Sequence, residues 1–528
     1  STKISERGYQ AMQAFFNGHQ YLLNITGRNV STLFIPHCGS DRKLTRTLDS
    51  LFSRGDNAAL IDVFGKKHLV PIAKFMLAIG DAQSSKTMLL ERYLWQHNIP
   101  IISPGSVSHW LDNTVQYMTI ARMSASNTKL VPLTLNVLHK LKLEKILFLY
   151  SNSAYGRSAL QIISDNAKFH HICIQSVIKV DNTAESVNEA ADFLATTEHL
   201  PRAILAFVDE EVKKPLLSKL HMKANIYWRR EGRIFLMVHG LPAYDDEYDS
   251  DLRETYKGSL SIDEQLDFVW TESMTDDAYS RYLNTFDLST AQINPYYALY
   301  WQQKRDCYLS ETEHVDPSLH TRCDLMCLLE PQPTEDCPQS TPVTNIDNDY
   351  ITAKYIYLTW MAFTSVIHNT PSHQHAELFA NKSKLFDKLL HSQIPKHQDS
   401  SEQFRLFDSD SHQGRPNYTV TQWRRDMHSP LPIYECSDID NIVTRNTPTF
   451  YVNDLVVADI SSLCSDETPT SSTPVVGSIR DSSNENSGEI VLYVAVGILA
   501  VASIAMLFFI ILTHCSCDSE SRSRWKGM

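Results

Sequence analysis

Histidine, cysteine and acidic side chains gather in three short stretches where metal binding could be expected. The run "HCSC" (514–517) places two thiols beside an imidazole, and His170 and His171 are adjacent. A zinc site needs further ligands at a suitable spacing, and the histidine pair has none. Residues 408–414, "DSDSHQG", begin like a calcium loop but have no glycine at its sixth position and no glutamate at its twelfth. We therefore expect no metal site.

Catalytic patterns are also missing from the sequence. It has no glycine loop that would cradle phosphates, no serine turn of the hydrolase type and no histidine pair of a zinc protease. The formal charge of -13 argues against nucleic acid as a partner, because phosphate binding requires a basic surface. We predict that the protein is not an enzyme and carries no cofactor.

Helices and strands alternate between residues 128 and 240. Apolar residues recur at helical spacing in 128–142, and short continuously apolar runs such as 145–151 are typical of buried strands. We expect helices at 128–142, 158–167, 186–200 and 211–222, and strands at 145–151, 172–180, 203–209 and 233–240. This pattern predicts a parallel sheet covered by helices on both faces.

The first 120 residues repeat this rhythm less clearly. We expect helices at 9–23, 46–53 and 86–98, strands at 31–37, 74–80 and 99–103, and later a strongly apolar helix at 350–368. Two α/β units in series would result. Open parallel sheets bind ligands at the carboxyl ends of their strands, so two such sheets facing each other would form a cleft for a small ligand.

Residues 490–512 carry no charged side chain. At about 1.5 Å per residue, this segment is long enough to cross a hydrocarbon core about 30 Å thick. Acidic residues precede it and basic residues follow it, which places the C-terminus in the cytoplasm. We expect a single-pass type I protein of the cell membrane with an extracellular N-terminal part. Cys515 and Cys517, just beyond the segment, are candidates for acylation.

Other features fit an extracellular chain. Four sequons for N-glycosylation are present, at Asn24, Asn29, Asn381 and Asn417. Residues 305–345 are rich in Cys, Pro and acidic residues and predict a disulfide-pinned loop, and the Ser/Thr/Pro-rich residues 465–488 predict a stalk. No signal peptide is visible, so we expect the sequence to be a mature form or a fragment.

Five stretches carry a pattern that is specific because of its order. They are "AIGDAQSS" (78–85), "QHNIPIISPGSVSHWLDN" (96–113), "SNSAYGRSAL" (151–160), "NPYYALYWQQKRDC" (294–307) and "FDSDSHQGRPNYTV" (407–420). Together they resemble the Venus-flytrap ligand-binding domain of metabotropic glutamate receptors and their class C relatives, over most of residues 6–425. The broader family also contains natriuretic-peptide receptors. The resemblance implies an α/β, two-lobed fold of the periplasmic-binding-protein-like type I, followed here by one transmembrane helix.

The resemblance also implies a division of the chain. The expected parts are lobe 1 (1–126), lobe 2 (127–250), a return to lobe 1 with the disulfide-pinned loop and the final hairpin of lobe 2 (251–430), a stalk (431–489), the transmembrane helix (490–512) and a cytoplasmic tail (513–528). In the family a first strand and a cysteine precede the helix that residues 9–16 resemble. We therefore expect lobe 1 to lack that strand and the sequence to be incomplete at its N-terminus.

In the resembling family, two loops of lobe 1 bind the carboxylate of an α-amino acid. In the first loop Ser84 or Ser85 matches the family's serine, and capping of the following helix is the alternative role. In the second loop Gly105 and Val107 stand at the places of hydroxyl-bearing residues, which leaves only the neighbouring Ser106 and Ser108.

The acidic residues that hold the ammonium in the family are not matched. Asn127 stands at one of these positions, and Gly240 falls near the other. Tyr155 matches cleanly, although a turn aromatic that packs on its own helix is the alternative. An ammonium left desolvated without an acidic partner would be strongly destabilised. The resemblance therefore implies an unknown extracellular ligand other than glutamate.

Eight of the ten cysteines precede the apolar segment and should mostly pair outside the cell. The resemblance implies a bridge between Cys307 and Cys323. It also implies that Cys173 pairs with a cysteine nearer the membrane, which could be Cys436 or Cys464. Cys327 and Cys337 could close a second loop, although sequence does not determine the connectivity, and Cys38 is left without a partner.

These features favour a cell-surface receptor or receptor subunit. Residues 513–528 are too few for a signalling domain, and 490–512 contains no Gly-x-x-x-Gly pair. Output would then come from dimerisation, for example through helix 86–98, or from a partner chain. The alternatives are a binding protein that clears or buffers its ligand and a structural assembly subunit whose cleft is degenerate.

Overall fold

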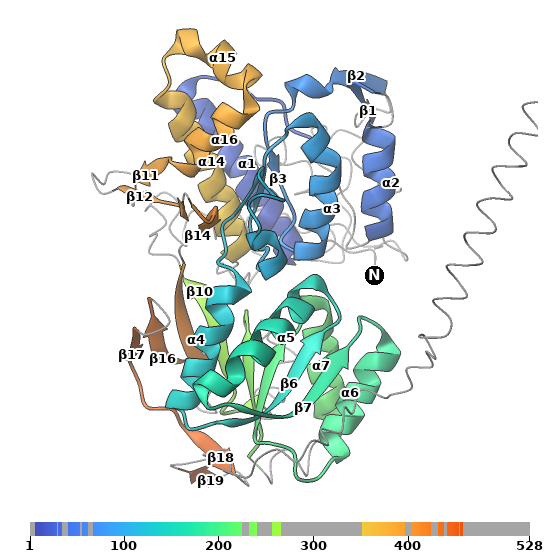
Figure 1. Ribbon diagram of the computed structural model, residues 1–528, viewed down its shortest axis with the longest axis vertical. Helices are drawn as coiled ribbons and strands as arrows, with labels where there is room; N and C mark the ends of the chain where they lie inside the picture. The colour runs from blue at the N-terminus through green and yellow to red at the C-terminus, as the bar shows by residue number, and fades with distance from the viewer. Residues whose placement is uncertain are drawn as a thin grey trace, which may run out of the picture. The chain divides into compact units, whose positions relative to one another are not determined.

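In the computed structural model, a large sheet is built in the order β17-β16-β15-β10-β9-β8-β6-β7 (Figure 1). Its central strands β7, β6, β8, β9 and β10 are parallel, as the alternation of helices and strands predicts. The strands are β6 (Lys145–Ser151), β7 (Cys173–Val180), β8 (Ala203–Phe207), β9 (Ile234–Val238) and β10 (Leu260–Gln265). The helices between them are α4 (Asn127–Lys140), α5 (Ala154–Asn166), α6 (Ala184–Thr196) and α7 (Glu210–Lys223). We call this part lobe 2.

The structure describes part of the chain. The described residues are 6–28, 30–33, 41–52, 55–61, 67–223, 232–239, 256–265, 351–395, 403–408, 410–414, 416–423, 431–437, 441–452 and 455–457. The chain separates into a unit Ser1–Ser471 and a unit Ser472–Met528, and all described residues lie in the first. The predictions for 490–512, 513–528, 305–345, Asn29 and Gly240 therefore lie outside the described residues. So do those for Cys38, Cys307, Cys323, Cys327, Cys337, Cys464, Cys515 and Cys517.

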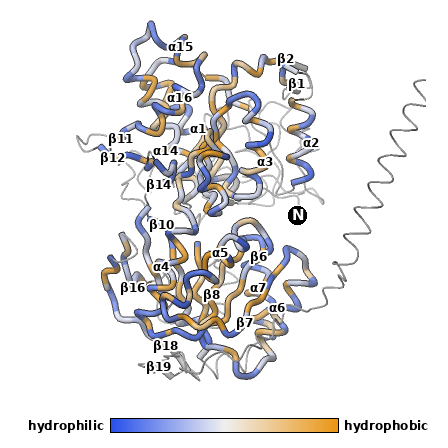
Figure 2. The backbone as a smooth tube through the Cα atoms, viewed as in Figure 1, coloured by the Kyte–Doolittle hydropathy of each residue, from blue (hydrophilic) through white to orange (hydrophobic). Residues whose placement is uncertain are grey.

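Successive residues of the central strands point to two different cores. Phe148 and Leu205 pack with α4 and α5, whereas Leu149 and Ile204, one residue away on the same strands, pack with α6 and α7. Alternation of side chains along a strand requires this arrangement when both faces are covered. Figure 2 shows the hydrophobic residues concentrated along these strands. The prediction of a sheet covered on both faces is confirmed.

Four later segments extend the same sheet and shift two predicted boundaries. β10 pairs in parallel with β9, and β15 (Asn417–Gln422), β16 (Leu431–Cys436) and β17 (Ile442–Thr444) follow it as antiparallel strands. Lobe 2 therefore continues past residue 250, and the stalk does not begin at residue 431. Sequence composition missed this because β16 and β17 are short strands at the edge of the sheet.

A second sheet forms lobe 1, in the order β13-β14-β5-β4-β3. Its strands are β3 (Ala78–Ile79), β4 (Ile101–Ser103), β5 (Ile120–Arg122), β13 (Phe407–Asp408) and β14 (Gln413–Gly414). β3, β4 and β5 are parallel, and β14 joins β5 in parallel from almost 300 residues away in the sequence. Ile101 packs with α2 (Asp41–Phe52) and α3 (Ser84–Leu94). The next residue, Ile102, packs into the core around α1 (Glu6–Thr26) and α14 (Ile351–His368).

Helices α1 (Glu6–Thr26) and α14 (Ile351–His368) pack closely against each other in lobe 1. The Phe15 and Trp360 rings meet edge to face with their centroids 5.1 Å apart. Gly18 allows this approach, because a Cβ atom there would lie 2.5 Å from the Trp360 side chain. The predicted apolar helix at 350–368 is thus a core helix. Within the described residues, no helix combines the length and apolar character that crossing a membrane requires.

The remaining described elements are short. They are β1 (Asn57–Ile61) with β2 (Lys67–Pro71), β11 (Gln393–Pro395) with β12 (Gln403–Arg405), β18 (Phe450–Val452) with β19 (Leu455–Val457), and helices α15 (His375–Ala380) and α16 (Lys382–Leu390).

Candidate functional site

Two segments pass side by side between the lobes. Residues 123–126 link β5 to α4, and β14 ends at Gly414, shortly before β15 begins. The Ser126 N–H donates to Gln413 Oε1 at 3.1 Å, and the Arg122 N–H donates to the His412 carbonyl at 2.9 Å. We call this region, together with the end of β10, the junction.

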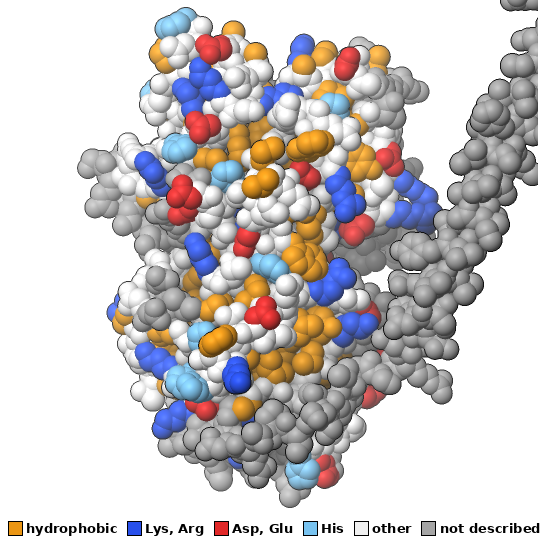
Figure 3. Space-filling view, viewed as in Figure 1, with side chains coloured by type: hydrophobic (Ala, Val, Ile, Leu, Met, Phe, Trp, Pro, Cys, Tyr) orange, Lys and Arg blue, Asp and Glu red, His pale blue; other side chains and the backbone are white. Residues whose placement is uncertain are grey.

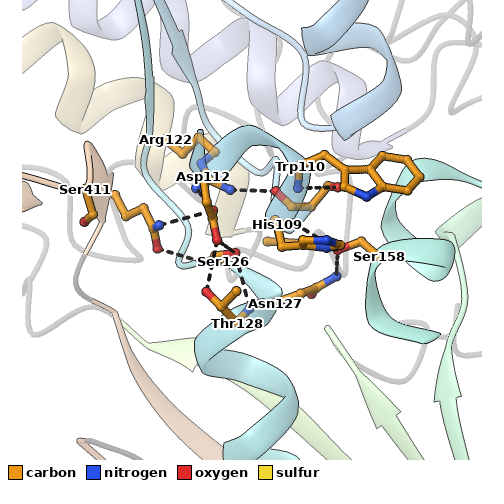
Figure 4. Close-up of polar contacts among 12 residues, drawn as sticks. His109, Trp110, Asp112, Arg122, Ser126, Asn127, Thr128, Ser158 and Ser411 are labelled. Carbon is orange, nitrogen blue, oxygen red and sulfur yellow. Dashed lines mark hydrogen bonds and ion pairs between the residues drawn. The ribbon is translucent and has the colours of Figure 1, made fainter. Parts of the chain in front are cut away.

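Asp112 ties lobe 1 to the start of α4 at the junction (Figure 4). Its Oδ1 pairs with the Arg122 guanidinium and accepts from Gln413 Nε2 at 3.2 Å. Its Oδ2 accepts from Ser126 Oγ at 2.8 Å and from Thr128 Oγ1 at 3.1 Å. Ser126 is also the N-cap of α4. Arg122 is 1% exposed, and burial lowers the pKa of its guanidinium although Asp112 opposes this shift.

Ser84 does not cap α3, so the alternative role predicted for it is wrong. The N-cap position is Gln83, which makes no side-chain capping bond. Ser84 Oγ instead accepts from the N–H groups of Val107 at 3.2 Å and Ser108 at 3.1 Å. The hydroxyl therefore joins the first loop of lobe 1 to the second, which is a contact between segments that local sequence rules cannot indicate.

Ser106 is buried in a cluster of hydroxyl groups. Its Oγ lies 2.7 Å from both Thr87 Oγ1 and Ser103 Oγ, and its N–H donates to Ser103 Oγ at 3.2 Å. Ser85 is half-buried at the start of α3. Since Ser84 accepts from the next two N–H groups, the backbone donors at 106–108 are all occupied inside lobe 1. Carboxylate binding would have to displace these contacts.

Asn127 and Tyr155 come together at the first turns of α4 and α5. Asn127 Nδ2 donates to the Tyr155 carbonyl at 3.2 Å and to Ser158 Oγ at 3.1 Å. Asn127 Oδ1 and the Tyr155 hydroxyl are buried without a hydrogen-bond partner among the described residues. The Tyr155 ring contacts Phe207 and His239, each with centroids 5.7 Å apart. Burial raises the pKa of Tyr155 well above its usual value, so its hydroxyl stays a donor.

His239, at the end of β9, adds a third buried polar group that sequence reasoning missed. Lys213 Nζ donates to the carbonyls of Val238 at 3.0 Å and His239 at 2.8 Å, which holds this strand end in place. Burial, and then the charge of Lys213, lower the pKa of His239 to about 3. The ring is therefore neutral, and its buried Nε2 has no partner within the part of the chain that the structure describes.

Glu264, near the end of β10, was also missed. It follows Leu260 and Ile262 at a spacing of two, so it shares their buried face of the strand. An acidic residue in register with two buried aliphatic residues is the sequence signal that could have found it. Its Oε2 accepts two hydrogen bonds, from Ser124 Oγ at 2.9 Å and from the Tyr355 hydroxyl at 2.8 Å.

Other contacts cross between the lobes. His109 Nδ1 lies 2.8 Å from Ser158 Oγ (Figure 4). The Arg157 guanidinium lies 5.5 Å from the Trp110 ring centroid. The Gln83 side chain donates to Glu211. The start of α5 therefore contacts the second loop of lobe 1 directly.

The two described cysteines behave differently. Cys173 is disulfide-bonded, and Cys436 is a free thiol that is 1% exposed. Cys436 was one of two predicted disulfide partners of Cys173, and this pairing is therefore wrong. Burial raises the pKa of the Cys436 thiol to about 11, which keeps it protonated. Cys436 lies on β16, near the opposite edge of the sheet from β7, which carries Cys173.

The three described sequons differ in exposure. Asn24 in the last turn of α1 and Asn381 before α16 are exposed. Asn417 is half-buried in β15, between β10 and β16, and Thr419 of its sequon is 2% exposed. The first two are the better candidates for a glycan.

Asn381 is expected to carry a glycan as well as cap a helix, since its Oδ1 accepts from the Lys384 N–H at 3.0 Å. Ser383→Ala should remove the glycan alone, whereas Asn381→Gln should also lose the cap, at a further cost of about 1 kcal/mol in stability. Gel mobility after glycosidase treatment and thermal unfolding of both variants test this. Unchanged mobility in Ser383→Ala would contradict the glycan, and equal stability of the two variants would contradict the cap.

Comparison with known proteins adds two findings. Residues 51–305 match the family model described as the receptor family ligand binding region. A stretch of 240 residues, 44% of this chain, is 21% identical to a metabotropic glutamate receptor of Drosophila melanogaster. The match spans 23% of that receptor's length. Together with the mixed α/β sheets, these findings support a class C receptor-like, periplasmic-binding-protein-like ligand-binding region in this chain.

Proposed function

We propose that the protein is a single-pass cell-surface receptor or receptor subunit that binds a small extracellular ligand between its two lobes. The observation that carries this proposal is a set of buried atoms, at the strand and helix ends of lobe 2, that have no hydrogen-bond partner among the residues that the structure describes. Asn127 Oδ1, the Tyr155 hydroxyl and His239 Nε2 all belong to it. Native proteins leave few buried polar atoms unsatisfied, and a polar ligand would satisfy these.

The proposed ligand is not glutamate or another simple α-amino acid. The backbone donors at 106–108 are already bonded to Ser84 and Ser103. Asn127 is uncharged and His239 is neutral, so neither supplies the negative charge that an ammonium requires. A ligand with an uncharged hydrogen-bonding group fits these side chains better.

The membrane part of the proposal rests on the sequence. The uncharged segment 490–512 and the exposed sequons at Asn24 and Asn381 support an extracellular lobe region on a membrane anchor. On the face drawn in Figure 3, acidic and basic side chains of the described residues are interspersed, which does not favour a polyanionic partner such as nucleic acid. Signal output through dimerisation or a partner chain remains part of the proposal.

A second candidate is a structural assembly subunit that binds no ligand. It is favoured by the internal hydrogen bonds of Ser84 and Ser106, which occupy the donors that a carboxylate ligand would use. A protein that clears or buffers its ligand would share the binding site and differ only in lacking an output.

Tyr155→Phe is the test of the binding site. Because the hydroxyl has no protein partner among the described residues, its removal should leave thermal stability without ligand unchanged. We would screen the full chain in detergent by thermal shift against amino acids, amines, nucleosides and sugars. A stabilising compound should bind Tyr155→Phe up to about tenfold more weakly, since one hydrogen bond contributes about 0.5–1.5 kcal/mol.

Tyr434→Phe, on strand β16 of the same sheet, is the matched control and should keep the affinity of the unmodified protein. L-glutamate should give no shift. Micromolar binding of glutamate would contradict the ligand class, and a screen without any stabilising compound would favour the structural subunit.

A further inference from the structure

Glu264 connects both lobes through its carboxylate. It lies on β10 of lobe 2, and it accepts hydrogen bonds from Ser124 in the link between the lobes and from Tyr355 on α14 of lobe 1. The three residues are nearly inaccessible, with Glu264 7%, Ser124 2% and Tyr355 1% exposed. A rotation of the lobes about the junction would separate these partners and admit water to the carboxylate.

This carboxylate has no cationic partner among the described residues. The groups that face it are the Tyr355 hydroxyl of α14, Tyr418 at the opposing position of β15, Tyr155 of α5, and the Ala125 N–H. Asp263, its neighbour in β10, adds a negative charge. Burial keeps the pKa values of the three tyrosines well above the usual value, so they stay protonated and neutral.

Opposing effects act on the proton of Glu264. Burial without a counter-ion disfavours the charged form, while hydrogen bonds from Tyr355, Ser124 and Ala125 favour it. Burial is the larger effect and raises the pKa of Glu264 to about 7. The same carboxyl exposed to water would titrate near its ordinary value of about 4.3.

We propose that Glu264 makes the junction a proton-sensitive hinge, in which proton binding favours the lobe arrangement that buries this side chain and proton loss favours its opening. When one state of a protein raises the pKa of a group, the group stabilises that state fully at pH values below its ordinary pKa. That stabilisation is lost as the pH rises through the raised pKa. The arrangement should therefore loosen between about pH 4.3 and about pH 7. This coupling between proton binding and lobe arrangement would regulate the proposed ligand site between the lobes. Only its effect on ligand affinity rests on the proposed function.

The test measures the distance between the lobes in the full chain without ligand. Spectroscopic labels carried by non-natural amino acids at exposed Met118 in lobe 1 and Met222 in lobe 2 would report this distance. We expect the fraction of molecules with separated lobes to rise with pH. Glu264→Gln, which is neutral at every pH, should abolish this dependence and keep the lobes together.

Tyr355→Phe provides a second variant with a different expected result, a shift of the transition. It removes a donor that favours the charged form, so the transition should move to higher pH, whereas Glu264→Gln removes the transition. Thermal unfolding at each pH confirms that both variants fold. A lobe distance that responds to pH equally in Glu264→Gln and the unmodified protein would overturn the proposal. So would a distance that is independent of pH in all three proteins. Neither outcome bears on ligand binding, which the Tyr155→Phe experiment tests separately.

Discussion

Gly414→Ala is expected to lower the free energy of unfolding by about 3 kcal/mol, which is the upper end of the usual cost of overpacking. Gly414 ends β14 where it runs beside the link between the lobes. A Cβ atom there would overlap the carbonyl oxygen of Met123 and crowd its carbonyl carbon. Both are backbone atoms of a buried residue, so neither can move without displacing β5 from β14. Denaturant unfolding of the full chain measures the loss.

Gly80→Ala is the matched control in the same lobe. Its Cβ would lie 2.9 Å from Ile101 Cγ2, the end of a side chain that can turn away. We expect a clearly smaller loss of stability than in Gly414→Ala. Similar losses in both variants would show that close approach to the Met123 backbone is not what requires glycine at position 414.

Lobe 2 could be predicted from sequence because its signals are local and repeated. The apolar run Lys145–Ser151 and the helix Asn127–Lys140 are each marked by their own periodicity, and short loops then force the parallel order. β16 and β17 could not be predicted in this way. They are short, and β15, which joins them to the sheet through β16, is far from β10 in sequence.

The candidate site was only partly predictable for a related reason. Resemblance identified Asn127 and Tyr155, which the structure brings together at adjacent helix ends. It could not show that Ser84 bonds to the second loop, because that contact depends on how two loops meet. His239 and Glu264 were missed because each has meaning only through partners on other elements, such as Lys213 and Tyr355.

Asp112→Ala is expected to have the largest effect of any polar substitution at the junction. Arg122, which is 1% exposed, would stay buried without its carboxylate partner. Among the described residues, its Nη1 would still donate to the Ser108 carbonyl at 3.0 Å. Removing one partner of a buried ion pair costs about 3–5 kcal/mol, and because the Asp112 side chain is 26% exposed we expect about 3 kcal/mol. Loss of the bonds to Ser126 and Thr128 adds to this, since both hold the start of α4.

A double-mutant cycle separates the stranded charge from the other lost contacts. Arg122→Met leaves a partly exposed carboxylate and should cost less than Asp112→Ala. Combining the two removes the unpaired charge, so the double variant should be more stable than the sum of the two single losses predicts, by about 1–3 kcal/mol. Glu377→Ala, which breaks the exposed pair with Lys384, is the control and should cause no measurable loss. Strict additivity at Asp112 and Arg122, measured by denaturant unfolding, would mean that the pair does not hold the junction together. The effect of Asp112 on the start of α4 would then come from its hydrogen bonds with Ser126 and Thr128.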